Sequence, residues 1–198
     1  MVSVFVVSVT ILSACSGSIQ IGGPPTGAPT CPTPTDPSPE RLPGPLVLTA
    51  QSVPSAALVP CLRGTLPTGW TFQNLDAQRG KARISIDFHQ DGTHAATITL
   101  TQECDVRGSR QTDTDQPGTQ RYDRVYEVQS GYRGERYYVF RGGCIEYHFN
   151  LHGSRSAEQV AAVSLFFGFV DRDLLRRYVH DYSDGRVELD PTAAEGAR

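Results

Sequence analysis

Residues 83–101 read RISIDFHQDGTHAATITLT, and this stretch decides the fold. Apolar and polar residues alternate on both sides of a turn-forming tetrad at 90–93. Because successive side chains of a β-strand point to opposite faces of a sheet, the alternation predicts two strands, each with one apolar and one polar face. The tetrad joins them into a hairpin. The outward side chains are expected to be Arg83, Ser85, Asp87, His89, Thr97, Thr99 and Thr101.

A second hairpin is predicted further along the chain. Two apolar and aromatic runs, at 136–140 and 144–151, are separated by Arg141, Gly142 and Gly143. Glycine accepts the positive φ angles of a tight turn, so the two runs are expected to pair as antiparallel strands. The polar face of the second run is expected to carry Glu146, His148 and Asn150.

One weaker strand, at 121–128, lies between these hairpins and follows a polar segment at 105–120. The polar segment is expected to be a surface loop. If the strands follow one another in an up-and-down meander, the sheet has about five strands. One face of that sheet is apolar and needs a cover.

Two helices are predicted after the last strand. Ser156 and Gln159 are spaced as a capping box, and apolar residues then recur at helical spacing up to Gly168. A second helix is expected to begin at an Asp171 cap and to end before Gly185. The fold class is therefore α+β: an antiparallel sheet of about five strands with two C-terminal helices packed on one face. The inward side chains of the second helix are expected to be Leu174, Leu175, Tyr178 and Val179.

The first fourteen residues are apolar or small and are too short to span a membrane. They end in Leu12-Ser13-Ala14-Cys15, which resembles the lipobox of bacterial lipoproteins, although no Lys or Arg precedes Arg41. The resemblance implies that residues 1–14 are a signal peptide, that Cys15 is acylated, and that lipid anchors the protein to the membrane outside the cytoplasm. Two alternatives are an ordinary buried thiol at Cys15 and cleavage that releases a soluble secreted protein.

Residues 15–57 are dense in Pro, Gly, Ser and Thr, so they are interpreted as the lipidated cysteine and a tether. Residues 58–190 are predicted to form a single α+β domain, and 191–198 a disordered tail. The lipoprotein resemblance covers about the first quarter of the chain. Beyond it the sequence is similar in appearance to uncharacterised actinobacterial envelope proteins.

Four cysteines remain once Cys15 is acylated, in a compartment where disulfides persist. In an up-and-down meander, strand parity brings Cys104 and Cys144 to the same end of the sheet, which predicts a bridge between them. Cys31 is then left to pair with Cys61. Because Cys61 also approaches that end, Cys61–Cys104 and Cys61–Cys144 remain alternatives.

The composition argues against nucleic acid as a partner, because the net charge is −3 and the basic residues are scattered among acids. The sequence contains neither a Gly-x-Ser-x-Gly elbow nor a glycine-rich phosphate loop, and no cofactor is expected. The possible ligand-binding face comprises Asp87, His89, Glu146 and His148. We interpret the domain as a non-enzymatic module that binds an envelope protein or a cell-wall ligand. The alternative is an extracytoplasmic hydrolase or metal-dependent enzyme that uses His148 with Asp87 or Glu146.

Replacing Cys15 by Ser tests the anchor. The acyl chains supply the membrane affinity, so the Cys15→Ser protein should be unprocessed or released and should leave the membrane fraction. Fractionation and intact-mass measurement check this. Unchanged mass and membrane retention would contradict lipidation.

Overall fold

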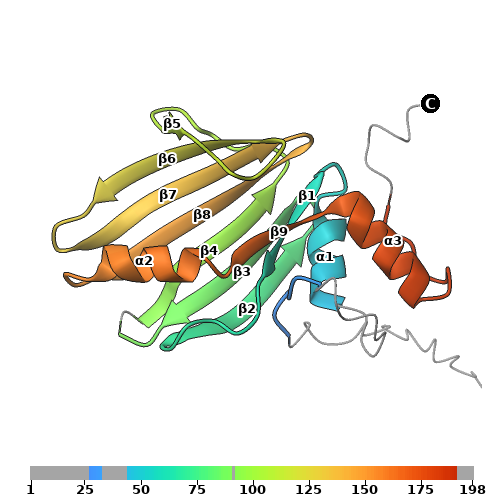
Figure 1. Ribbon diagram of the computed structural model, residues 1–198, viewed down its shortest axis with the longest axis horizontal. Helices are drawn as coiled ribbons and strands as arrows, with labels where there is room; N and C mark the ends of the chain where they lie inside the picture. Colours follow the sequence, from blue (N-terminus) through green and yellow to red (C-terminus); the bar gives the residue numbers. More distant parts are fainter. Residues whose placement is uncertain (1–26, 33–43, 91, 191–198) are drawn as a thin grey trace, which may run out of the picture.

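The computed structural model describes residues 27–32, 44–90 and 92–190. Within these ranges the chain has an α+β fold that is mostly strand: a seven-stranded antiparallel sheet, a two-stranded sheet and three helices (Figure 1). The expected fold class is confirmed, but the sheet is larger than the five strands expected. The strands of the large sheet are β2 (Trp70–Gln78), β3 (Lys81–Phe88), β4 (Gly92–Thr101), β5 (Arg110–Thr112), β6 (Thr119–Glu127), β7 (Gly131–Phe140) and β8 (Gly143–His152). The small sheet pairs β1 (Leu58–Leu62) with β9 (Phe167–Asp171).

Both predicted hairpins are present, as β3–β4 and β7–β8. The alternation also gave the correct inward face, since Ile84, Ile86 and Leu100 are fully buried. At the β7–β8 turn, Gly142 has a φ of 71° and lies against the carbonyl of Ser55, where a Cβ atom would clash. Glycine is therefore required there both for the turn and for the close approach.

The strand order is β2-β3-β4-β8-β7-β6-β5, so the simple meander was wrong. After β4 the chain crosses to the far edge of the sheet, forms β5, and returns through β6 and β7 to place β8 beside β4. The polar segment at 105–120 makes the crossing and contributes β5. A physical reason is that β4 carries an apolar face of fully buried residues, and such a central strand needs hydrogen-bonding partners on both sides.

The apolar face of the large sheet is covered by α2 (Ser156–Ser164) and by the small sheet (Figure 1). The helical spacing of the apolar residues predicts that Phe167 continues the helix, but α2 ends at Ser164. Phe167 instead begins β9, where its ring packs on those of Tyr147 and Phe149. The capping box at Ser156 was also wrong, because its hydroxyl donates to the carbonyl of Gly153 and no side chain caps α2.

The second C-terminal helix, α3 (Arg172–Tyr182), begins as predicted. Its cap Asp171 accepts hydrogen bonds from the backbone N–H groups of Asp173 and Leu174 at 2.9 and 3.0 Å. The expected packing of α3 on the large sheet was wrong, because Leu175 and Val179 belong to a separate core with α1 (Gly44–Ser52), β1 and β9. Leu174, expected inside, is half exposed.

The folded part starts earlier than the expected boundary at residue 58. Helix α1 lies beside α3 at one end of the molecule (Figure 1), and its Leu46 and Ala50 are fully buried. The buried guanidinium of Arg172 donates to the carbonyl of Ala50 at 2.6 Å and to that of Asp190 at 3.0 Å. The sequence did not predict α1, because its apolar run is only a few residues long and the surrounding stretch is rich in proline. The predicted signal peptide, Cys15 and the tail at 191–198 lie outside the described residues.

Both predicted disulfides are confirmed, with Cα–Cα distances of 4.9 Å for Cys31–Cys61 and 5.8 Å for Cys104–Cys144. The alternative pairings of Cys61 are thereby wrong. Cys144 lies opposite Thr101 in the β4–β8 register, so direct strand pairing, and not a meander, brings it to Cys104. Cys31 is held by a backbone hydrogen bond of 2.9 Å from its N–H to the carbonyl of Leu62. Among the described helices, none has the length and apolar character needed to cross a membrane.

Candidate functional site

The face of the large sheet opposite α2 is polar and carries no covering helix among the described elements. The strand register aligns its side chains in rows across the sheet. One row runs Arg83, Thr99, Glu146 and Tyr137, and the next runs Ser85, Thr97, His148 and Glu135. Side chains in register on antiparallel neighbours lie about 5 Å apart. The insertion of β8 beside β4 therefore places Glu146 and His148 next to the threonines of β4.

The β3, β4 and β8 members of these rows, apart from Ser85, help to line a groove with a volume of about 480 Å³. This volume lies within the roughly 300–1,000 Å³ typical of small-molecule sites. Because β4 lies between β3 and β8 in the sheet, its threonines form the floor between the lining residues of these two strands, and the start of the crossover after β4 lines one end. Its lining residues are Lys81, Arg83, His94, Thr97, Thr99, Thr101, Glu103, Cys104, Asp105, Glu146 and His148.

Next to the groove, on β6 and β7, the same face carries a polar network centred on Glu135. Its carboxylate accepts hydrogen bonds from the hydroxyls of Tyr137 at 2.5 Å and Tyr126 at 2.7 Å, and from Arg124 at 3.2 Å. The Arg124 guanidinium also donates to the carbonyl of Arg107, which fastens the crossover to the sheet. A carboxylate with several donors is a stabilising arrangement, so this half of the face is structural.

The groove half of the face differs because several of its charged side chains have no partner among the described residues. Among the described residues, the side chains of Lys81, Arg83 and Glu146 form neither a hydrogen bond nor an ion pair. The hydroxyls of Thr97 and Thr99 likewise form no hydrogen bond to the described chain, and Thr99 is only 8% exposed. Polar groups in a hollow that are left unpaired by the fold are available to a ligand.

The neighbouring carboxylates of Glu146 and Glu135 differ in pKa because only Glu135 has hydrogen-bond donors around it. Burial raises the pKa of Glu146, and the negative charge of Glu135 raises it further, against the opposing effects of His148, Lys81 and Arg83. Burial also acts to raise the pKa of Glu135, but the hydrogen bonds from Tyr137 and Tyr126 and the charges of Arg124 and His148 outweigh it and lower that pKa. The fold thus stabilises the charge of Glu135 and disfavours that of Glu146.

The four residues of the predicted ligand-binding face are not all brought together. Glu146 and His148 line the groove. Asp87 does not line the groove. Its carboxylate accepts a hydrogen bond of 2.7 Å from the backbone N–H of His94, a groove residue whose φ is 61°. His89 lies apart, with its Nδ1 3.3 Å from the carbonyl of Gly69 and its ring against that of Phe88.

No group of three or more His, Cys, Asp or Glu side chains within the described ranges is arranged to hold a metal ion. The constellation of His148 with Asp87 and Glu146, on which the enzyme alternative rested, does not converge in one hollow, because only two of its members line the groove.

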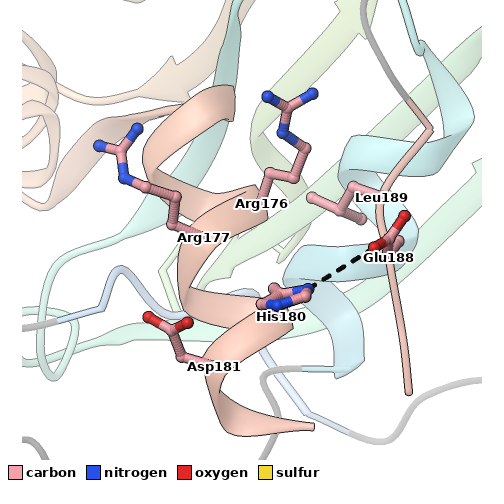
Figure 2. Close-up of a pocket in the computed structure, with 6 residues that line it drawn as sticks. All are labelled: Arg176, Arg177, His180, Asp181, Glu188 and Leu189. Carbon is pink, nitrogen blue, oxygen red and sulfur yellow. Dashed lines mark ion pairs between the residues drawn. The ribbon is translucent and has the colours of Figure 1, made fainter. Parts of the chain in front are cut away.

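A second hollow of about 350 Å³ lies between α3 and the chain at 187–190 (Figure 2). His180 and Glu188 face each other across it, with Nδ1 and Oε1 3.6 Å apart, and Leu189 forms an apolar floor. Because this ion pair joins the two sides of the hollow, we interpret it as part of the packing between α3 and the C-terminal segment.

Comparisons with protein-family models, with curated proteins and with solved structures find no match to this chain. Its function must therefore be inferred from the geometry of the groove.

Sequence reasoning identified the outward polarity of the threonines and of Arg83, but did not assign them to a site. The missing information was the β4–β8 pairing, which depends on how the chain crosses the sheet. Lys81 and the crossover residue Glu103 gave no signal in the sequence, because an isolated charge in a turn or loop is usually solvated.

The two carboxylates generate a paired prediction about stability at pH 7. Glu135→Gln removes charge from a triply hydrogen-bonded group and should lower the free energy of unfolding by about 1–2 kcal/mol. Glu146→Gln removes an unpaired, half-buried charge and should raise it by roughly 0.5 kcal/mol. Urea denaturation of both variants checks the signs.

The pH dependence provides the control. Glu146 has a raised pKa in the folded state, so wild type gains stability as pH falls through that pKa, and the advantage of Glu146→Gln should shrink there. Glu135 has a lowered folded pKa, so its contribution is present at neutral pH and is lost as pH falls through it. Equal signs for the two variants at pH 7 would contradict the division of the face into paired and unpaired halves.

Proposed function

We propose that the protein is a lipid-anchored, extracytoplasmic binding module that holds a polar ligand of the cell envelope in the groove over β3, β4 and β8. The observation that carries the proposal is the set of unpaired polar groups in a hollow, beside a network of the same chemistry that is fully paired. A protein that needed this face only for solubility would have no reason to leave Glu146 half buried and without a partner.

The location is supported by the two disulfides, since such bridges persist in oxidising compartments outside the cytoplasm. The Cys104–Cys144 bridge also has a local role, because it ties the end of the groove to the first residues of β8. The lipobox-like sequence at 12–15 supplies the anchor in this proposal. A rigid, bridged groove loses little conformational freedom when a ligand binds.

A hydrolase remains the second candidate, and one observation favours it. Glu146 has a raised pKa and lies beside His148 on the same face of β8, as an acid and base pair would. Against it, no hydrogen bond among the described residues joins a threonine hydroxyl of the groove to His148 or Glu146, as expected for a nucleophile activated by a base. Binding therefore accounts for more of the lining than catalysis does.

The test is ligand capture from solubilised envelopes by the mature chain, compared with two tryptophan variants. Thr99→Trp fills the floor of the groove, whereas Gln111→Trp adds the same side chain to the exposed edge strand β5 on the same face, outside the groove. The proposal predicts a molecule, identified by mass spectrometry, that is retained by wild type and Gln111→Trp and lost with Thr99→Trp.

Circular dichroism shows whether the Thr99→Trp variant folds. If it does not, Glu146→Gln provides a second groove variant. It should weaken retention without loss of stability. A ligand retained equally by wild type and all variants would contradict the proposal. Recovery of the ligand in a cleaved form, only with wild type, would replace binding by the hydrolase.

A further inference from the structure

The groove separates its charges by sign. Lys81 and Arg83 lie on the β3 side, and Glu146 lies on the β8 side, with the threonines of β4 between them. Glu103, at the start of the crossover, adds a second acid at the end that the crossover lines. Asp105 does not contribute a free charge, because its carboxylate is bound by Arg107 at 2.6 Å.

These opposite charges do not neutralise one another directly. No ion pair joins Lys81 or Arg83 to Glu146 or Glu103 in the described part of the chain. The backbones of two strands that flank one intervening strand are about 10 Å apart, so a single small molecule lying across β4 can reach the side chains of both flanking strands. A ligand with complementary charges would be drawn to one orientation.

The floor adds a requirement for amide-like groups. A threonine hydroxyl both donates and accepts hydrogen bonds, so Thr97 and Thr99 match the N–H and C=O groups of a peptide equally well. An extended peptide advances about 3.4 Å per residue, so roughly three residues span the distance between the charged sides. The lining residues offer no exposed aromatic ring of the kind on which a sugar would stack.

We propose that the ligand of the groove is a short dipolar peptide of about three residues, with its carboxylate at Lys81 and Arg83 and its ammonium group at Glu146 and Glu103. This inference rests on the proposed function of the groove and specifies its ligand class. A glycan of similar length is the competing ligand.

The experiment is a heteronuclear NMR titration of the mature chain with tri-alanine. Its N-acetylated form, its C-terminal amide, di-alanine and uncharged chitotriose are titrated in parallel. Tri-alanine should shift the amide signals of 97–101 and 144–148. Either cap should weaken binding about tenfold, because it removes one charge-assisted contact. Di-alanine should also bind more weakly, since it is too short to reach both sides.

Two variants assign the orientation. Arg83→Gln should reduce the effect of amidation and keep that of acetylation, whereas Glu146→Gln should reduce the effect of acetylation and keep that of amidation. Arg133→Gln, at an exposed position outside the groove, is the matched control and should change neither. This crossed pattern is not expected from a general loss of stability.

The adverse outcomes separate the two proposals. Groove shifts with chitotriose and none with tri-alanine would overturn the dipolar peptide and leave the groove as a binding site. Binding of tri-alanine that is insensitive to both caps would also overturn it. The proposed function of the groove is tested separately by the capture experiment. It fails if the Thr99→Trp variant retains the same envelope ligand as wild type.

Discussion

The pairing of β4 with β8 is the constraint on which the rest of the molecule depends. It brings residues almost fifty positions apart into register, with Thr99 opposite Glu146 and Thr97 opposite His148. The Cys104–Cys144 bridge fixes this register at one end, because a slip of one residue would both break the geometry of the bridge and turn every inward side chain of β8 outward. The apolar core on one face and the groove on the other are two consequences of the same pairing.

The open face divides into one half whose polar groups are paired with one another and another half where several are not. On β6 and β7 the acid, the tyrosines and the arginine satisfy one another, and Arg124 also fastens the crossover. On β3 and β8, the side chains of Lys81, Arg83 and Glu146 have no hydrogen-bond or ion-pair partner among the described residues, and Glu146 is partly buried. Unpaired polar groups of this kind are a common feature of functional sites, where local stability is sacrificed.

Local patterns predicted the elements whose formation depends on neighbouring residues. The period of two in 83–101 predicted a hairpin and its inward face, and Asp171 predicted the start of α3. The wrong predictions concern tertiary packing. Phe167 has the spacing of a helix yet pairs in β9, and Leu46 lies in a proline-rich stretch yet is buried in the core that α1 shares with β1, β9 and α3. The groove was missed for the same reason, since Thr99 and Glu146 become neighbours only through a crossover that no local signal specifies. The Cys104–Cys144 bridge was nevertheless predicted correctly. Its prediction depends only on the directions in which β4 and β8 run, and these directions are the same in the expected meander and in the observed strand order.

The central claim is that the groove is occupied in the native envelope, and carboxyl footprinting of the mature protein tests it most directly. Modification of Glu146 and Glu103 by a carbodiimide and an amine would be compared between intact envelopes and purified protein. Glu158, exposed on α2 at the opposite face, serves as the internal reference. The account predicts slower modification of Glu146 and Glu103 in envelopes, with Glu158 unchanged. Equal rates at Glu146 in both samples, or protection confined to Glu158, would contradict it.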